Sequence, residues 1–202
     1  MRPADFIRGA ANLVAAVCVL PMVLFWKIYS ALTGKDALFV TFSQLLSLFP
    51  GTIGIYLRRA FYRAALKTCA GDISIGFGTI FSHAAVRLGR GVYIGGGGTI
   101  GKVDIGDGTV IGSNVDIPSG RRQHLRGAEQ RVEDPHEGAF VTISIGTKCW
   151  IGNSAVILAP IGDGCTIGAG SVVVKPVHDG QTVVGNPARE VPRNSSAPAA
   201  SA

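Results

Sequence analysis

Charged residues and cysteines are both scarce in this sequence, and their scarcity excludes several classes of protein. Only 16% of the 202 residues are charged, whereas 47% are apolar. A chain this apolar does not have the composition of a disordered protein. Its four cysteines, Cys18, Cys69, Cys149 and Cys165, include no CxxC pair. We therefore expect small buried thiols in a reducing compartment, not a disulfide framework or a metal site.

Residues 10–26 lack any charge and form the most hydrophobic stretch of the chain. Together with the apolar residues that follow, they reach the roughly 20 residues needed to cross a bilayer core. A secretory signal peptide is the competing interpretation, but the stretch has no small-x-small cleavage site. We expect a retained membrane anchor. Residues 10–66 could span the membrane, re-enter it or lie on its surface, and the sequence leaves these three alternatives open.

The excess positive charge is confined to the same region. Residues 1–70 carry eight basic and two acidic side chains, a net charge of +6, whereas the remaining chain carries eleven of each. Basic residues beside an apolar segment are typical of proteins that bind anionic membrane surfaces. Because they are not interleaved with aromatics on a polar face, we expect no nucleic-acid partner.

A second apolar segment, residues 37–55, is broken at Pro50-Gly51. It is followed at 56–67 by an amphipathic basic stretch with aromatic residues, which suits a helix lying in the membrane interface. The alternative is that these helices pack on a soluble core.

Glycine is abundant, with 28 residues, and from Asp72 onward it follows a short period. An aliphatic residue followed by a small one recurs near every sixth position. Pairs of this kind are Ile75-Gly76, Leu88-Gly89, Ile94-Gly95, Ile100-Gly101, Ile105-Gly106, Ile111-Gly112, Ile145-Gly146, Ile151-Gly152, Ile161-Gly162 and Ile167-Gly168. A fixed short period predicts a β-solenoid, in which the aliphatic residues point inward and stack from coil to coil.

The period has two interruptions. Residues 118–142 are polar and charged, and an insertion in a solenoid must leave the coils as a loop. Between Ile157 and Ile161 the next aliphatic residue arrives after four positions instead of six. The sequence therefore predicts a helical membrane anchor at 1–70, a β-helix at 71–192 with an extruded loop at 118–142, and a disordered tail at 193–202.

These repeats resemble the hexapeptide-repeat acyltransferases. The closest match in pattern is the run Cys149-Trp150-Ile151-Gly152-Asn153-Ser154-Ala155-Val156-Ile157 with Gly185-Asn186-Pro187-Ala188-Arg189, which resembles the maltose, nodulation-factor and exopolysaccharide O-acetyltransferase branch. The N-terminal segment SQLLSLFPGTIGIYLRRAFYR is similar to membrane-associated members linked to surface-polysaccharide assembly. The resemblance implies a left-handed parallel β-helix, all-β after the N-terminal helices.

The resemblance also implies a homotrimer with acetyl-coenzyme A lying between neighbouring β-helices. Gly152, Ala169 and Lys175 match positions near the cofactor, and Arg189 matches a basic position that reaches its phosphates. The family's catalytic histidine leaves the coil near the position of His124.

The expected chemistry needs one base. A thioester is already an activated acyl donor, so the acceptor hydroxyl must lose its proton to become a nucleophile. A neutral imidazole, with an ordinary pKa of about 6.5, can take that proton near pH 7. His124 is the candidate general base, and His136, further along the loop, is its main rival.

Acceptor binding is assigned less specifically. His83 either faces the acceptor or lies on the surface, and Arg122 either grips a phosphorylated acceptor or is simply solvated. Trp150 either caps the groove or packs in the coil, and packing is favoured. The sugar-acetylating members carry an Asn-centred patch where this chain has Val92-Tyr93-Ile94, which puts the identity of the acceptor in doubt.

The sequence predicts an acetyl-coenzyme A-dependent O-acetyltransferase acting on a glycan or lipid-linked saccharide, attached to the inner membrane and facing the cytosol. It requires no metal. The alternatives are an inactive membrane-tethered trimeric scaffold and a zinc enzyme like the γ-type carbonic anhydrases, although the spacing of His83, His124 and His136 does not fit the latter. A soluble serine acetyltransferase is disfavoured because its N-terminal helices should be polar.

Overall fold

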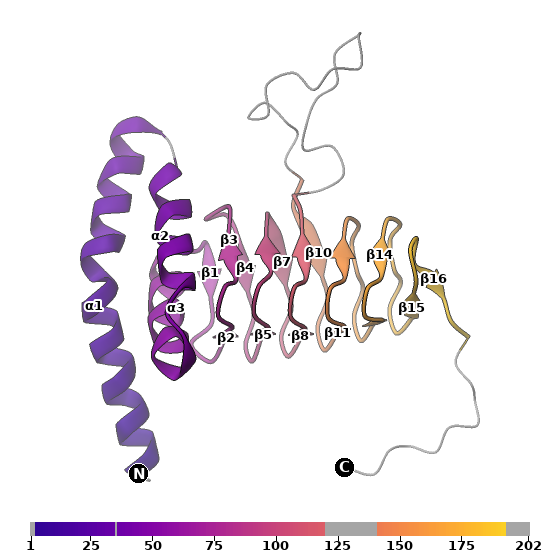
Figure 1. Ribbon diagram of the computed structural model, residues 1–202, viewed down its shortest axis with the longest axis horizontal. Helices are drawn as coiled ribbons and strands as arrows, with labels where there is room; N and C mark the ends of the chain where they lie inside the picture. The colour runs from indigo at the N-terminus through magenta and orange to yellow at the C-terminus, as the bar shows by residue number, and fades with distance from the viewer. Residues whose placement is uncertain (1–2, 35, 120–140, 193–202) are drawn as a thin grey trace.

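The chain folds into a parallel β-helix with three helices at its N-terminal end (Figure 1). The computed structural model describes residues 3–34, 36–119 and 141–192. The helices are α1 (Pro3–Thr33), α2 (Ala37–Ser47) and α3 (Gly51–Ala65). The predicted order of apolar helices followed by a β-solenoid is therefore confirmed.

Three parallel sheets form the sides of the β-helix, and the chain visits them in turn. Sheet A contains β1 (Thr68–Cys69), β4 (Arg87–Leu88), β7 (Val103–Ile105) and β10 (Ile143–Ile145). Sheet B contains β2 (Ser74–Ile75), β5 (Tyr93–Ile94), β8 (Val110–Ile111), β11 (Trp150–Ile151), β13 (Thr166–Ile167), β15 (Thr182–Val184) and the antiparallel β16 (Arg189–Glu190). Sheet C contains β3 (Ile80–Phe81), β6 (Thr99–Ile100), β9 (Asp116–Ile117), β12 (Val156–Ile157) and β14 (Val172–Val173).

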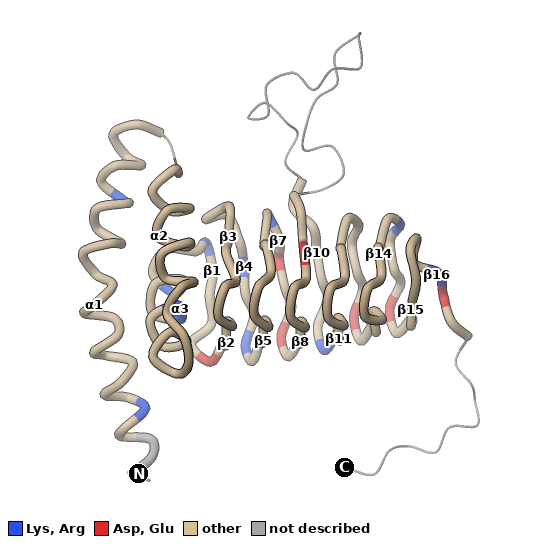
Figure 2. The backbone as a smooth tube through the Cα atoms, viewed as in Figure 1, with Lys and Arg blue, Asp and Glu red and all other residues tan. Residues whose placement is uncertain are grey.

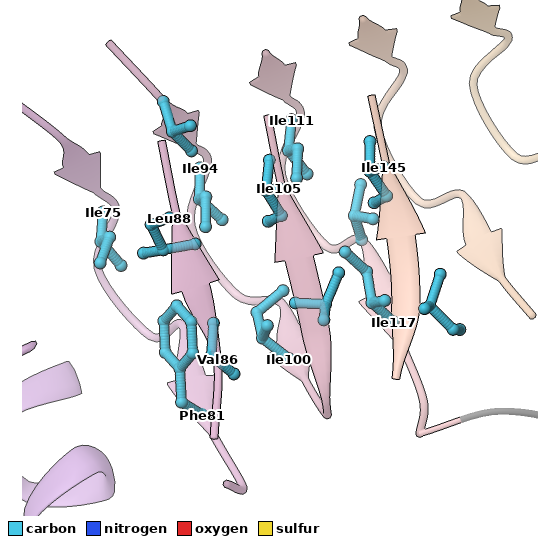
Figure 3. Packing of buried hydrophobic residues seen from close by; sticks show 14 of the residues in the cluster. Ile75, Phe81, Val86, Leu88, Ile94, Ile100, Ile105, Ile111, Ile117 and Ile145 are labelled. Atoms are coloured by element: carbon cyan, nitrogen blue, oxygen red, sulfur yellow. The ribbon is translucent and has the colours of Figure 1, made fainter. Parts of the chain in front are cut away.

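The core is a set of stacked aliphatic side chains inside the coils (Figure 3). Ile75 pairs in register with Ile94, and Ile94 with Ile111, and all three are buried. In the two-residue strands from β2 to β14 the second residue is buried and points inward, because successive side chains of a strand point to opposite faces. The predicted inward positions of the hexads are confirmed.

The short step between Ile157 and Ile161 does not break the stack. Ile161 makes parallel bridges with Ile145 before it and Val177 after it, so sheet A continues by single-residue contacts. Ile161 is buried like the other inward residues.

Helices α2 and α3 close the first coil, mainly through arginines of α3. The buried Arg58 donates from Nε to the Ile75 carbonyl (2.9 Å) and from Nη1 to the carbonyls of Leu46 (3.0 Å) and Phe49 (2.8 Å). Arg59 Nε donates to the Ile73 carbonyl at 2.7 Å. The expectation that residues 56–67 lie in the membrane interface is therefore wrong for Arg58 and Arg59, because both donate hydrogen bonds to backbone carbonyls of the protein.

An aromatic cluster fills the space between the helices and the coil. The Tyr62 ring lies 4.5 Å from that of Phe81, and Phe39 stacks on Phe61 at 5.9 Å. The Tyr62 hydroxyl hydrogen-bonds Ser43 Oγ at 2.7 Å, and Ser43 Oγ accepts from the Phe81 backbone N–H at 2.7 Å. The alternative in which these helices pack on a core is thus correct for α2 and α3.

Helix α1 packs on α2 and α3 and forms the outermost layer (Figure 1). From Phe6 to Thr33 it is long and apolar enough to cross a membrane, a test that a buried core helix or a signal sequence would also pass. Cys18 on this helix is exposed and Cys69 half-buried, so the expectation of buried thiols is wrong for Cys18 but confirmed for Cys149 and Cys165.

Candidate active site

One edge of the β-helix carries His83, Lys175 and the two ends of the predicted extruded loop. At this edge, which we name the C-to-A edge, the chain passes from sheet C to sheet A in every coil. The connecting segments are 82–86, 101–102, 118–142, 158–160 and 174–176. The predicted extruded loop therefore leaves the β-helix between β9 and β10 (Figure 1).

The two ends of that loop are held together at its base. The Val141 N–H donates to the Ser119 carbonyl at 3.0 Å, and Ser119 Oγ accepts from the Lys102 N–H at 2.9 Å. Ser119 itself is buried. The candidate base His124, its rival His136 and the candidate acceptor residue Arg122 lie outside the described residues, so only the base of their loop is placed.

A cavity of about 550 Å³ opens beside the loop base. Its polar lining comes from three successive coils: Ser82, His83, Thr99, Asp116 and Ser119. The size and the mixture of hydroxyl, imidazole and carboxylate groups suit a small polar ligand.

His83 is the titratable base of this cavity that the structure describes. It is half-buried, and desolvation lowers its pKa below the ordinary 6.5. The positive charge of Lys102 lowers that pKa further, while the carboxylate of Asp36 opposes the shift. A neutral imidazole at pH 7 both donates and accepts hydrogen bonds, as binding a hydroxyl requires. The interpretation of His83 as facing the cavity is therefore favoured over a solvated surface position.

A second cavity, of about 270 Å³, lies at the last coil and brings two predicted cofactor residues together. Lys175, at the C-to-A edge, and Arg189, on β16, both line it and are both exposed. Gln181 Nε2 donates to Glu190 Oε2 at 2.8 Å, and its Oε1 accepts from the His178 N–H at 2.8 Å. Two exposed cations on one rim form an arrangement that can hold phosphate groups.

The other two predicted cofactor residues, Gly152 and Ala169, lie at a different edge, where sheet B turns toward sheet C. A Cβ atom on Gly152 would lie 2.5 Å from the Ala169 nitrogen, so the stacking of adjacent coils by itself requires glycine here. Ala169 is exposed and presents only a methyl group at this edge. Within one chain these two residues do not share a cavity with Lys175 and Arg189.

Trp150 lies on the outer face of sheet B, with 55% of its surface exposed. The favoured packing role inside the coil is therefore wrong, because Trp150 is the outward residue of β11 and Ile151 the inward one. In the strand register Trp150 follows Val110, which follows Tyr93, and all three are exposed. Together they form a row, here named the sheet B row.

No family model matches, and neither does any curated protein. Solved structures do match. A maltose O-acetyltransferase from Clostridium difficile 630 is 24% identical, with a TM-score of 0.66 over 76% of this chain and 83% of that one.

Two further solved structures share the fold. A hexapeptide-repeat-containing acetyltransferase from Vibrio cholerae is 21% identical, with a TM-score of 0.58 over 76% of this chain and 89% of that one. A galactoside acetyltransferase in complex with coenzyme A is 23% identical, with a TM-score of 0.59 over 77% and 78%. The chain therefore has the β-helix fold that is found in hexapeptide-repeat acetyltransferases.

Sequence reasoning missed Lys102 and Ser119, although the hexad phase contains the signal. His83 comes two residues after the inward Phe81, Lys102 two after Ile100, and Ser119 two after Ile117. Lys175 stands in the same phase after Val173. Counting the phase from the inward residue of sheet C would have placed all four at one edge.

Proposed function

We propose that this protein transfers an acetyl group from acetyl-coenzyme A to a hydroxyl group of a glycan or lipid-linked saccharide. The observation that carries the proposal is the C-to-A edge. It combines a polar cavity, the base of a histidine-bearing loop and a cationic cavity on a fold that acetyltransferases share. The solved relatives complexed with coenzyme A or acetyl-coenzyme A support the choice of donor.

The reaction needs one proton transfer in each direction. The imidazole of His124 takes the proton from the acceptor O–H as the oxygen attacks the thioester carbonyl carbon. When the tetrahedral intermediate collapses, the carbon–sulfur bond breaks and the leaving thiolate takes the proton from the imidazolium. The products are the acetyl ester and free coenzyme A, and the imidazole is neutral again.

Chain length allows His124 to reach the cavity. His124 comes five positions after Ser119, and a fully extended chain of that length spans at most about 18 Å. His136 is five residues from Val141 and has the same reach. The choice of His124 therefore depends on its early position in the loop, where the family resemblance places the base.

Donor binding is assigned to Lys175 and Arg189, with Gly152 and Ala169 at the neighbouring edge. The two pairs lie on different edges of one chain, so a cofactor touching both must lie in a groove between two chains. A homotrimer supplies such a groove. The sheet B row of Tyr93, Val110 and Trp150 supports this assembly because it exposes apolar surface in the middle of one side.

The acceptor binds in the cavity of His83, with Arg122 and Trp150 as further candidates. We place the protein at the inner membrane with its β-helix in the cytosol, where acetyl-coenzyme A is made. The apolar surface of α1 supports the membrane attachment.

The test is release of free thiol by the purified full chain in detergent, with acetyl-coenzyme A and a set of hydroxyl acceptors. His124→Ala should lower kcat by about 10²–10⁴ while leaving coenzyme A binding unchanged. His136→Ala serves as the matched control on the same loop and should keep most of the rate. If His124→Ala releases thiol as fast as the wild type, the assignment of the base is wrong.

The same assay separates the alternatives. A scaffold would neither bind coenzyme A nor release thiol. For the zinc enzyme, no group of three or more His, Cys, Asp or Glu that could hold a metal occurs within 3–34, 36–119 and 141–192, so no described arrangement favours it.

A further inference from the structure

The two faces of α1 differ in what covers them. Ala15, Val19, Val23 and Trp26 are buried against the other helices. The opposite face, here named the outer face of α1, consists of exposed apolar side chains. Its large members are Phe6, Leu13, Val17, Leu24, Ile28 and Leu32. Figure 2 shows α1 uncharged along nearly all of its length.

The attachment of α1 to the rest of the molecule restricts how it can meet a bilayer. α1 contacts α3 and α2, which in turn pack on the first coil. It runs across the axis of the β-helix (Figure 1). If α1 in this arrangement crossed the bilayer, α3 and the first coil would enter the hydrocarbon at the same depth, with the exposed Arg63 and Asp72. Such charges are costly in lipid.

Basic side chains are exposed on α1 and next to it. Arg8 and Lys27 are exposed on α1 itself. Arg63 of α3 lines a surface hollow together with Asn12 and Ala16 of α1, so it lies beside that helix. Cations next to an apolar strip complement anionic headgroups, each contributing to surface binding.

We propose that α1 lies in the plane of an anionic lipid surface, with its outer face immersed, and that the β-helix stands upright on it. The first coils then lie nearest the lipid and the last coil furthest away. The polar residues of the His83 cavity come from the first three coils and Val156 of the fourth coil also lines it, whereas the cavity of Lys175 and Arg189 is at the far end. As a consequence, which rests on the proposed function, the acceptor is a membrane-borne hydroxyl amphiphile and the donor enters from water.

Vesicle flotation tests whether the outer face of α1 binds an anionic lipid surface. The full chain should float with phosphatidylcholine vesicles containing a quarter phosphatidylglycerol, and less with phosphatidylcholine alone. Val17→Asp combined with Leu24→Asp should lower the floating fraction at least fivefold. Phe77→Asp is the matched control, because Phe77 is 51% exposed on the first coil but off α1, and it should float normally. Equal flotation of both variants would overturn the proposal.

Cysteine labelling tests the orientation. Gly9→Cys and Ala37→Cys, in a Cys18→Ser/Cys69→Ser background, place thiols near the N-terminal end of α1 and at the start of α2, just after α1 ends, and both native residues are exposed. In cell-derived vesicles a membrane-impermeant maleimide should label both positions from the cytosolic side. Labelling of Gly9→Cys only from the opposite side would show that α1 spans the membrane and would contradict the proposal.

These outcomes are independent of the transferase. The proposed binding of α1 to lipid is refuted if both aspartate variants float equally or if Gly9→Cys is labelled only from the opposite side, even if thiol is released in detergent. Conversely, a chain that floats and labels as expected but never releases thiol supports the docking and refutes the proposed function.

Discussion

The two ends of the β-helix are closed in different ways. At the first coil, Arg58 and Tyr62 are fully buried, and Arg58 donates hydrogen bonds to three carbonyl groups. At the last coil, β16 pairs with β15 but leaves a cavity whose cations, Lys175 and Arg189, are exposed. The same coil geometry therefore serves stability at one end and leaves charged groups available for a ligand at the other.

The largest expected effect is on the free energy of unfolding, and it comes from substituting Arg58 at the first coil. Arg58→Met removes the side-chain donor of the Ile75, Leu46 and Phe49 carbonyls in a buried site, and of these Leu46 keeps a backbone donor, the Phe49 N–H at 3.4 Å. The free energy of unfolding should therefore fall by about 3–5 kcal/mol. Urea unfolding in detergent measures it. Arg63→Met, on the exposed face of the same helix, should stay within about 0.5 kcal/mol of the wild type. Similar losses in both variants would mean that Arg58 does not seal the coil.

Substitutions in the cavity of the last coil should change ligand binding and leave the free energy of unfolding almost unchanged. Lys175→Ala and Arg189→Ala should each raise the KM for acetyl-coenzyme A about tenfold, because each removes one charge-assisted contact to phosphate. Unfolding free energy should stay within about 0.5 kcal/mol. Arg87→Ala, an exposed cation on sheet A, is the control and should leave KM unchanged. A KM unaffected by either cavity variant would remove the donor assignment.

A smaller change at the first coil is expected from Tyr62→Phe. The Ser43 hydroxyl loses one hydrogen bond but still accepts from the Phe81 N–H, so the loss should be about 1 kcal/mol. Tyr93→Phe, on the exposed sheet B row, should change the unfolding free energy much less. A loss for Tyr62→Phe as large as that for Arg58→Met would indicate that the aromatic cluster, not the arginine, closes this end.

The smallest expected effect is on the pH dependence of stability, and it comes from a turn in the coils between the two ends of the β-helix. The Thr147 N–H and hydroxyl donate to Asp163, and these bonds hold the pKa of its carboxyl below the usual range. Because the folded pKa lies below the unfolded one, the contribution is present above about pH 4 and is lost as pH falls through the folded pKa. The melting temperature of Asp163→Asn should therefore decline less between pH 5 and 2.5 than that of the wild type. Parallel profiles would contradict this.

The coils were predictable from sequence because their rule is local. Each inward aliphatic residue stacks on its equivalent one coil later, so a period near six fixes both the fold and the buried positions. Even the irregular Ile161 keeps its place by bridging Ile145 and Val177.

The helical end was less predictable because its contacts join distant parts of the chain. The Phe81 N–H donates to Ser43, 38 residues earlier, and no period indicates such a pair. Arg58 and Arg59 contributed to an apparent membrane signature, although their partners are backbone carbonyls of the first coil. Charge counting cannot separate a structural arginine from a free one.

The candidate site was predictable from sequence only in part. Lys175 and Arg189 share a cavity, which the proposed role in donor binding requires. Gly152 and Ala169 lie on another edge, so the proposal that all four residues bind one cofactor needs a second chain. His83 could be placed by hexad phase, but its lowered pKa depends on burial and on Lys102, which is on the next coil.

The central claim, that the last coil holds a coenzyme A thioester, is tested most directly by calorimetric titration of the full chain in detergent with coenzyme A. The account predicts saturable binding at one site per chain with a Kd between about 1 μM and 1 mM, the usual range for enzyme substrates. Binding should weaken about a hundredfold in the Lys175→Ala/Arg189→Ala double variant. No heat of binding at millimolar coenzyme A, or unchanged affinity in the double variant, would contradict it.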